Sequence, residues 1–362
     1  MNIEASELQS NTFRCLPGCG FCCLCPAGLS PTEAARLRSD PRTRPGVADG
    51  QEPSLKLAGG NGACVFLASD RACSIYDERP RPCRAFPYST HVLERAQVSI
   101  NRACPGTWTA DAPPALAGLR AEEFLPNLEA RVAEARSVFE AFRSQAQRRG
   151  LFATAESVRN DLKDVPASLD LALLLGALCD LDAGRVVRRD PPSPADPKAL
   201  ARVRMALVRA AFAAKDGLSL PIRVAPDLSW ETWRLQGLRI QRLRLGASGR
   251  TEPLGELRVS ELDWLPADEP AAALARAYAA TLLARDHLYG LACHGVDAGG
   301  YQAHVARVFE HEFWNALADV WLRASAIARA AGRDRLDADG MRQGIAFFDM
   351  DFLDSPTIGA VL

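Results

Sequence analysis

The spacing of apolar side chains divides the chain into a loop-rich first part and a mostly helical remainder. From Leu116 to about Leu181, apolar residues recur at steps of three and four, which places them on one face of a helix. At the start of this stretch the stripe consists of Phe124, Leu128, Val132, Ala135, Val138, Phe139 and Phe142. Similar spacing predicts helices near residues 198–214, 268–290 and 300–331.

Another segment has the alternation of a β-sheet. Within residues 219–260, the apolar Leu238, Ile240, Leu243 and Leu245 are interleaved with the polar Arg239, Gln241, Arg242 and Arg244. Alternation of this kind is typical of a half-buried sheet. We therefore expect a small antiparallel sheet between the later helices.

Local signals also predict short elements in the first hundred residues. Ser30 and Glu33 form a capping box, and Pro31 occupies the first helical position, so a helix is expected from Pro31 to about Leu37. Short strands are expected at residues 63–67 and 96–100.

Two proline-rich segments suggest domain boundaries. Residues 110–115 contain paired prolines, which cannot continue a helix, and residues 189–197 contain four prolines. They divide the chain into a cysteine-rich module (1–112), a helical region (113–190) and an α+β region of unknown role (191–362). The expected fold class is α+β and mostly helical, with a loop-rich cysteine and metal module followed by a helical region that includes the small antiparallel sheet.

Composition excludes several broad functions. The chain of 362 residues is 48% hydrophobic and carries a net charge of −1, which argues against a general nucleic-acid binder or membrane-surface binder. No apolar run reaches the roughly 18 residues of a membrane span. Residues 1–14 lack the basic start and apolar core of a secretory signal, so a cytoplasmic location is expected.

Cysteine content changes the picture most. Nine of the eleven cysteines lie within the first 104 residues. Disulfides require an oxidising compartment, whereas clustered cysteines in a cytosolic chain more often bind metal. Thiolates bind zinc or hold iron–sulfur clusters, usually four to a site.

The spacing leaves the number of metal sites open. Eight of these cysteines suit two four-ligand sites, or one site with a reactive remainder. Cys22 and Cys23 are adjacent, and neighbouring side chains in an extended chain point to opposite faces. One of the pair can therefore face one site while its neighbour faces a second, or both can wrap the edge of one cluster.

The segment from Cys15 to Cys22 also has the CxxxCxxC spacing of radical enzymes that cleave S-adenosylmethionine, with Phe21 before the last cysteine. Such loops usually follow the first strand of a parallel barrel. The strand–helix alternation of a barrel is missing here, and no glycine-rich nucleotide loop lies between a strand and a helix. This motif therefore lacks its structural context.

The order of the cysteine segments resembles a known family. Cys15 and Cys19-Gly-Phe-Cys22-Cys23 are followed by Cys64-Val-Phe-Leu67, by Cys73-Ser-Ile-Tyr76 through Arg79-Pro-Arg-Pro-Cys83-Arg84-Ala-Phe86-Pro87, and by Cys104-Pro-Gly106. This order resembles the YkgJ-type cysteine-cluster family, which is described as zinc- or iron-chelating and to which flagellin lysine N-methylases are similar. The resemblance covers residues 13–106, and Cys25 has no counterpart in it.

The resemblance implies a ligand set and a cofactor. The implied metal ligands are Cys15, Cys19, Cys22, Cys23, Cys64, Cys73, Cys83 and Cys104. The methylase relatives favour an iron–sulfur cluster, of the 4Fe–4S type, over Zn²⁺. S-adenosylmethionine and a flagellin-like protein substrate are implied only if the chain acts as a lysine methylase. The alternatives are a zinc-stapled module that binds a partner and an iron–sulfur electron carrier.

Charged and aromatic residues near these cysteines fit the same hypothesis. Arg14, Arg79 and Arg84 flank ligand positions and could offset the negative charge of the thiolates, and Arg79 and Arg84 are the candidate cofactor-binding residues. The nearby aromatic residues are expected to shield the site or to pack as ordinary core. They are Phe66, Tyr76, Phe86 and Trp108.

Other polar residues are interpreted as structural. The pairs His304 and His311, and His287 and His294, are each seven residues apart, too far along a helix for one metal ion, so they are assigned to helix faces or core. Two further cysteines and three aspartates near the end of the chain are also interpreted as structural. Cys179 and Cys293 are expected to be buried, and Asp349, Asp351 and Asp354 to form a solvated edge.

Overall fold

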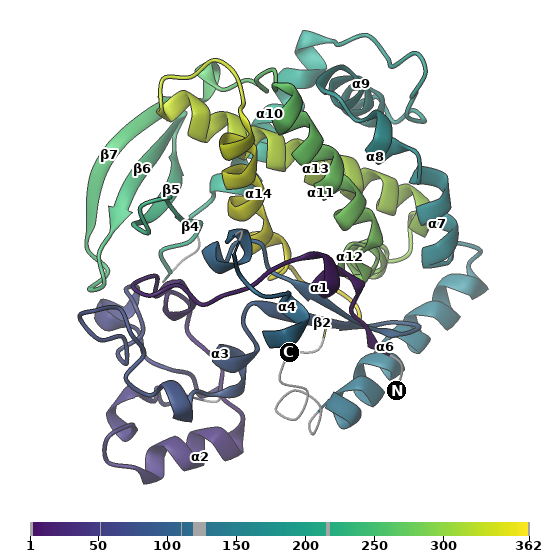
Figure 1. The fold of residues 1–362 in the computed structure, drawn as a ribbon. Coiled ribbons are helices and arrows are strands. Elements are labelled where there is room, and N and C mark those ends of the chain that lie inside the picture. Colours follow the sequence, from purple (N-terminus) through teal and green to yellow (C-terminus); the bar gives the residue numbers. More distant parts are fainter. Residues whose placement is uncertain (1–2, 51, 110, 119–127, 215–217, 361–362) are drawn as a thin grey trace.

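A cysteine-rich segment, a four-stranded sheet and a bundle of helices pack against one another in the computed structural model (Figure 1). The structure describes residues 3–50, 52–109, 111–118, 128–214 and 218–360. The expected fold class is confirmed, because the described chain is mostly helical, its first part is rich in loops, and a small antiparallel sheet follows. Within the described residues, no helix combines the length and the apolar composition that crossing a bilayer requires.

The capping-box helix forms as predicted. Helix α2 spans Pro31–Ser39, the Ser30 hydroxyl accepts from the Glu33 backbone N–H, and the Glu33 carboxylate accepts from the backbone N–H of Ser30. Two shorter helices in this part are α1 (Ser6–Ser10) and α3 (Arg81–Ala85).

The expected strand at residues 63–67 is wrong. The backbone N–H groups of Ala63, Cys64 and Val65 donate to three different segments, at Ala247, Cys23 and Lys56 respectively. Only isolated bridges form here, at Cys64 and at Leu67. A segment that changes partner at every residue cannot build a ladder, although its apolar alternation is that of a strand.

The expected strand at residues 96–100 is confirmed as β3 (Ala96–Ile100). It lies in the middle of a three-stranded sheet, antiparallel to β2 (Tyr88–Val92) and parallel to the two-residue β1 (Ile3–Glu4). Every residue of β3 is buried, because helices cover this sheet.

The second sheet is the antiparallel one that the sequence predicts. Its strands follow chain order as β4 (Ile222–Val224), β5 (Trp230–Gln236), β6 (Arg239–Leu245) and β7 (Thr251–Arg258). Trp233 and Ile240 pack into the main helical core, whereas Trp230 and Leu245 pack against residues of the cysteine-rich segment. The alternation therefore reflects a sheet with a buried partner on each face. Leu238 is an exception, since it lies exposed beside the turn between β5 and β6.

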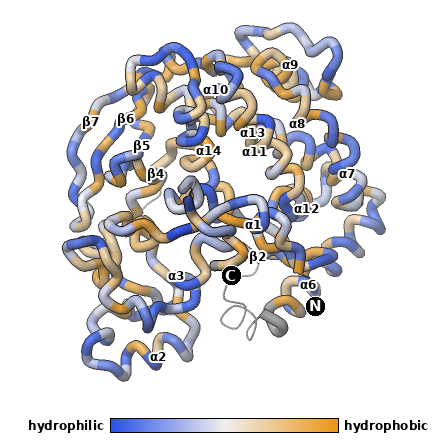
Figure 2. The backbone as a smooth tube through the Cα atoms, viewed as in Figure 1, coloured by the Kyte–Doolittle hydropathy of each residue, from blue (hydrophilic) through white to orange (hydrophobic). Residues whose placement is uncertain are grey.

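Helices account for most of the remaining chain. Their bounds are α4 Ala115–Gly118, α6 Leu128–Arg148, α7 Ala155–Leu162, α8 Val165–Ser168, α9 Leu171–Asp182, α10 Pro197–Phe212, α11 Glu269–Ala284, α12 Asp286–Ala298, α13 Val305–Ala330 and α14 Ala338–Phe352. The helices predicted near 198–214 and 300–331 are confirmed as α10 and α13, and the one near 268–290 is two helices that meet at Arg285. Figure 2 shows apolar backbone positions concentrated in the interior, along α13 and α14.

The apolar stripe of α6 differs from the prediction at one position. Val132, Ala135, Phe139 and Phe142 are buried, but Val138 is about half exposed. The buried residues alternate steps of three and four, and Val138 falls outside this register. Phe124 and the side chain of Leu128 lie outside the described residues.

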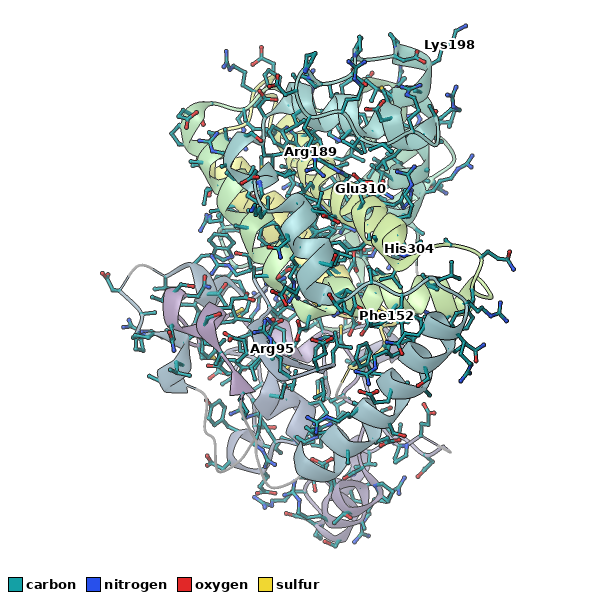
Figure 3. All side chains as sticks on the ribbon, turned by 90° about the vertical axis from the view of Figure 1, so that its right-hand side faces the viewer. Arg95, Phe152, Arg189, Lys198, His304 and Glu310 are labelled. Carbon is teal, nitrogen blue, oxygen red and sulfur yellow. The ribbon has the colours of Figure 1, made fainter. Side chains whose placement is uncertain are left out.

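The proline-rich segment 189–197 packs beside α9. The buried Asp180 carboxylate accepts from the Ser193 hydroxyl and from the backbone N–H of Arg188. Figure 3 shows Arg189 next to Glu310 of α13, and their charged groups are 3.9 Å apart. The domain boundaries near 112 and 190 stay predictions.

A buried ion network joins the two ends of the chain. Arg285 is only 1% exposed, and its guanidinium donates to the carboxylates of Glu7 and Asp349 and to the carbonyl of Ile100. The Tyr278 hydroxyl and the Arg102 backbone N–H also donate to Asp349. The network fixes the loop that leads to Cys104.

This network corrects the assignment of the C-terminal aspartates. Asp349 is fully buried, and Asp351 accepts from the buried Arg323 at 2.7 Å, so neither belongs to a solvated edge. Asp354 is exposed, as expected. The sequence does not show that Arg285, 64 residues earlier, lies within reach of Asp349.

Two buried histidines hold the last described residues. His91 of β2 and His287 of α12 share a hydrogen bond of 2.8 Å, and His91 also lies 3.1 Å from the Thr357 hydroxyl. Burial, followed by the positive charge of Arg285, lowers the pKa of His91 to about 3, and burial also lowers the pKa of His287. His287 is thus a core residue, as predicted, with a partner that the sequence did not indicate.

Replacement of Asp349 tests the ion network. Asp349→Ala leaves the buried Arg285 with half of its carboxylate partners, and we expect the free energy of unfolding to fall by about 3–5 kcal/mol. The matched control is Asp49→Ala, which removes the ion pair between Asp49 and Arg38. Because the Asp49 side chain is 93% exposed, this change should lower the free energy of unfolding by only about 0–1 kcal/mol. Denaturant unfolding measures both, and equal losses would contradict the buried role.

The histidine pair predicts a pH dependence of stability. Because the folded pKa values lie below the ordinary value of 6.5, the unfolded chain binds more protons as the pH falls below 6.5. Each histidine should then lower the free energy of unfolding by about 1.4 kcal/mol per pH unit. Unfolding at pH 6.5 and 5.5 should show a smaller loss for the double variant His91→Gln, His287→Gln than for the native chain. The exposed His311→Gln should keep the native slope, and an unchanged slope in the double variant would refute the assignment.

Candidate metal centre

Left-handed glycines shape the loop that carries the first four cysteines. Gly18 and Gly20 have φ values of 71° and 60°, which few other residues adopt without strain. The chain then enters a short 3₁₀ turn at Phe21–Cys23, and the Cys23 N–H donates to the carbonyl of Gly20. These tight turns present Cys19, Cys22 and Cys23 within a few residues of one another.

The sheet fixes this loop from the other side. Trp230 of β5 donates its indole N–H to the carbonyl of Cys19 at 2.8 Å, and the guanidinium of Arg71 lies 4.3 Å from the Trp230 ring centre. A side chain at Gly20 would press on the Trp230 ring. Sequence analysis missed Trp230 and Arg71, because nothing in the local pattern links residues more than 150 positions apart.

The remaining predicted ligands come from three further segments. The Cys64 N–H donates to the carbonyl of Cys23 at 2.7 Å, and Cys73 forms an isolated bridge with Leu67. Cys83 lies on α3, and Cys104 immediately precedes the 3₁₀ turn Pro105–Trp108. The chain therefore brings cysteines from four separate segments into one region of the fold.

Electrostatic coupling separates seven of the eight thiols into a set of three and a set of four, and Cys22 acts on all seven. Burial raises the pKa of Cys15, Cys19 and Cys104, and the negative charge of Cys22 raises each of these pKa values further. The charge of Cys15 also raises the pKa of Cys19 and of Cys104. We call Cys15, Cys19, Cys22 and Cys104 the first group.

The second group is also coupled to Cys22. Burial raises the pKa of Cys83 to about 12, and Cys22, Cys64 and Cys73 add to the increase. The pKa of Cys23 is raised by its hydrogen bond with Cys22, then by burial and by the same two thiols, Cys64 and Cys73. Cys23, Cys64, Cys73 and Cys83 form the second group.

Side-chain packing brings the second group together and separates it from Cys19. Cys19 lies in a hydrophobic cluster with Phe21 and Trp230, whereas Cys23 and Cys64 lie in another with Phe66, against which Cys73 and Cys83 pack. The adjacent Cys22 and Cys23 differ in exposure, since Cys22 is exposed and Cys23 is buried. The cysteine without a family counterpart, Cys25, packs against the first of these clusters.

Cys22 is the exception among these thiols. A hydrogen bond with the Cys23 thiol lowers the pKa of Cys22 to about 7, and the positive charge of Arg79 lowers it further against the effect of burial. Arg79 also counteracts the raised pKa of Cys15, Cys73 and Cys83, so its guanidinium faces both groups. It is held 3.6 Å from the ring centre of Tyr76.

A cavity of about 430 Å³ opens beside the first group. Its wall includes all four cysteines of that group together with Cys83. Two of the four, Cys15 and Cys22, are exposed, while Cys19 and Cys104 are buried. The cavity therefore reaches the thiols from solvent.

The predicted arginines and aromatic residues take different places. Arg79, Arg84, Tyr76 and Phe86 line the cavity, which is where a charge-balancing or shielding role requires them. Phe66 packs in the core of the second group. The other two predictions lie elsewhere. Arg14 donates to the carbonyl of Asp111, and Trp108 packs under Arg102.

None of the eight predicted ligands forms a disulfide in this structure. Among the described residues, no three His, Cys, Asp or Glu side chains stand close enough together to enclose a single metal ion. The donor set consists of soft sulfur ligands, which suit zinc and iron–sulfur clusters. The cysteines therefore fit such a group chemically, while their sulfur atoms are more widely spaced than a single ion requires.

Comparison with known families identifies the segment that carries these thiols. Residues 14–105 match the family CxxCxxCC, described as "Putative zinc- or iron-chelating domain". The match contains all eight predicted ligands, and it confirms the resemblance of this segment to a metal-chelating cysteine-cluster domain. Neither the curated proteins nor the solved structures gave a match. The relation to flagellin lysine N-methylases stays a prediction.

Gly106 tests how the first group is positioned. A Cβ at this position would overlap the carbonyl oxygen of Arg14, and the Arg14 N–H donates to the Gly106 carbonyl. Gly106→Ala should push apart the loops that carry Cys15 and Cys104, and we expect metal affinity to fall by about 10- to 100-fold.

Metal titration with a competing chelator measures this change. The control is Gly28→Ala, where an added Cβ meets no atom within 4 Å. Native affinity in the Gly106 variant, with a native circular dichroism spectrum, would contradict the positioning role.

Proposed function

We propose that residues 14–105 hold two metal centres, each bound by four thiolates. The first group, Cys15, Cys19, Cys22 and Cys104, binds an iron–sulfur cluster of the 4Fe–4S type. The second group binds a further cluster or a zinc ion. The observation that carries this proposal is that Cys15, Cys19 and Cys104 couple to one another and line one cavity, that Cys23, Cys64, Cys73 and Cys83 couple to one another, and that Cys22 couples to both sets.

The spacing of the sulfur atoms supports a cluster in the first group. Zinc holds its thiolates at about 2.3 Å, which brings four sulfurs to within roughly 3.8 Å of one another. No three described ligand side chains come this close, and the first group lines part of a cavity of about 430 Å³. The ligands of an inorganic cluster stand farther apart than those of a single ion, so open space beside these thiols favours a cluster.

The surroundings of the first group suit the same cofactor. An iron–sulfur cluster held by four thiolates is anionic and accepts or releases one electron, and positive charge and burial tune its potential. Arg79 supplies positive charge on the cavity side, and Phe21 and Phe86, in edge contact at 6.1 Å, supply an apolar wall. Arg84 lines the same wall and is the second candidate for a cofactor contact.

Serine variants test the two-centre proposal. Cys104→Ser should remove the visible absorption of the cluster and the iron of the first group, and leave the metal of the second group in place. Cys73→Ser should have the reverse effect. Cys179→Ser replaces a buried cysteine outside both groups and is the control.

Elemental analysis and absorption spectra of anaerobically purified protein read out the result. If both variants lost all of their metal, the eight thiols would hold one shared centre, and the two-centre proposal would be wrong. Full metal content in Cys104→Ser would refute the ligand assignment. A colourless native protein with stoichiometric zinc would refute the cluster.

An enzymatic role is the second part of the proposal. Structural zinc sites are closed, whereas the first group faces an open cavity, which favours an active centre over a staple. The resemblance to flagellin lysine N-methylases suggests transfer of a methyl group from S-adenosylmethionine to lysine side chains of a flagellin-like protein. Labelled S-adenosylmethionine with flagellin tests this activity, and Cys104→Ser is the matched inactive control. Absence of label on flagellin would favour an electron carrier or a partner-binding module instead.

A further inference from the structure

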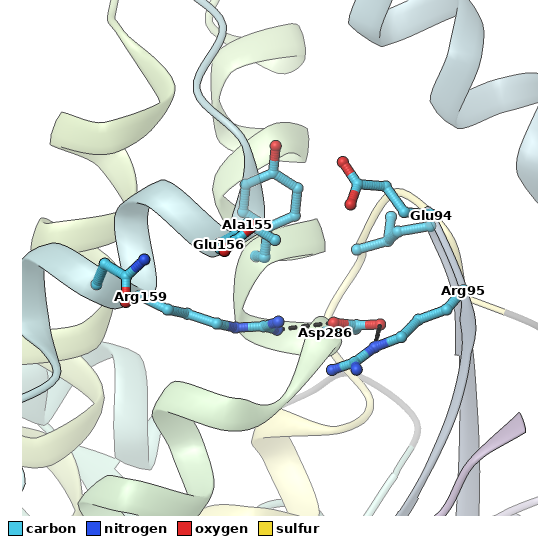
Figure 4. Close-up of a pocket in the computed structure, with 9 residues that line it drawn as sticks. Glu94, Arg95, Ala155, Glu156, Arg159 and Asp286 are labelled. Atoms are coloured by element: carbon cyan, nitrogen blue, oxygen red, sulfur yellow. Dashed lines mark hydrogen bonds and ion pairs between the residues drawn. The ribbon is translucent and has the colours of Figure 1, made fainter.

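A second cavity, of about 340 Å³, contains no cysteine in its wall. It lies between the turn that joins β2 to β3, helix α7 and the first turn of α12 (Figure 4). Its wall carries five charged side chains, and Arg95 places it on the face shown in Figure 3. Nothing in the proposed metal chemistry uses these residues.

One carboxylate oxygen at the base of this cavity has no hydrogen bond. Asp286 is only 3% exposed, and its Oδ1 accepts from Arg159 at 2.7 Å. Its Oδ2 is buried and accepts no hydrogen bond from any residue that the structure describes. A buried acceptor without a donor costs free energy, so this oxygen favours a donor in the cavity.

Arg95 is a second cation near this carboxylate, but it is loosely held. Its Nε lies 3.8 Å from Asp286 Oδ2, and its Nη1 lies 3.5 Å from Glu4. Both distances exceed the roughly 2.7–2.9 Å of a charge-assisted hydrogen bond. Figure 4 shows Arg159 and Arg95 reaching Asp286 from opposite sides. Because the Arg95 side chain is 46% exposed, it can swing into solvent and leave its place to another cation.

The charge of the wall favours a cation in that place. Three carboxylates, those of Glu94, Glu156 and Asp286, face two guanidinium groups, and one of these is already committed to Asp286. Leu93, Ala155 and Tyr289 provide apolar surface between the charges. An anion would have to displace or approach carboxylates on three elements.

We propose that this cavity binds an organic cation, an ammonium or guanidinium group on a short apolar chain, which replaces Arg95 as the partner of Asp286. The cation donates to Asp286 Oδ2, its charge is balanced by Glu94 and Glu156, and its chain lies against Leu93 and Tyr289. Arg95 occupies the cation's position when the cavity holds no ligand. This site is independent of the proposed metal function.

The test uses the full chain with n-butylammonium and n-butylguanidinium as probes and with butyrate as the anionic control of equal chain length. Arg95→Ala removes the competing cation, so binding of one of the two cations should become about tenfold tighter in a calorimetric or NMR titration. The two probes distinguish ammonium from guanidinium. Asp286→Asn should abolish binding, and Glu94→Gln should weaken it.

Glu140→Gln, on the exposed side of α6, should bind like the native chain, since Glu140 does not line the cavity. If Asp286→Asn fails to fold, Arg95→Ala and Glu94→Gln decide the result with opposite expected effects. Unchanged cation affinity in Arg95→Ala, or butyrate binding as strongly as the cations, would overturn the proposal. Arg95, Asp286 and Arg159 would then form a structural ion triad only.

Discussion

The burial of the Arg285 guanidinium is the constraint on which much of this structure depends. A cation that is 1% exposed has to be paired, and its partners come from residue 7, residue 100 and residue 349. Removing any partner leaves a buried charge that water cannot reach. The N-terminal helix, strand β3 and helix α14 are therefore held at one point, and Cys104 follows only four residues after Ile100. The later helices thus fix one of the proposed metal ligands.

A second anchor acts on the opposite side of the cysteine-rich segment. Trp230 binds the backbone of Cys19 and packs in the same cluster as Phe21. Cys19 and Cys104 are the two buried members of the first group, and each is positioned by a residue outside residues 14–105. The exposed members, Cys15 and Cys22, have fewer such restraints. A metal cofactor would supply the missing restraint by tying exposed thiols to buried ones, which is how metal binding adds to folding free energy.

Local sequence signals predicted correctly those elements that depend on interactions between neighbouring residues. The capping box at Ser30, strand β3 and the helices near 198–214 and 300–331 depend on neighbouring residues and were found in place. The cysteine spacing predicted a metal-chelating domain, because ligands at short intervals leave a pattern along the chain. The strand expected at 63–67 failed because its hydrogen-bond partners come from three segments. The burial of Asp349 and the role of Trp230 could not be predicted either, since each depends on a residue far away in the sequence.

Strand β3 connects the two cavities along the chain, and hydrogen bonds hold it to residues 284–286. Its first residues follow the turn with Glu94 and Arg95, and its last residue accepts from Arg285 on the way to Cys104. Between these ends, Gln97 donates to the carbonyl of Ala284 and accepts from the N–H of Asp286. Arg285 and Asp286 are adjacent. Arg285 binds the end of β3 that leads to Cys104, and Asp286 lines the cation cavity. Gln97 and Ile100 are thus both bound to this junction, so two consecutive residues of the helical part hold strand β3 between the cavities.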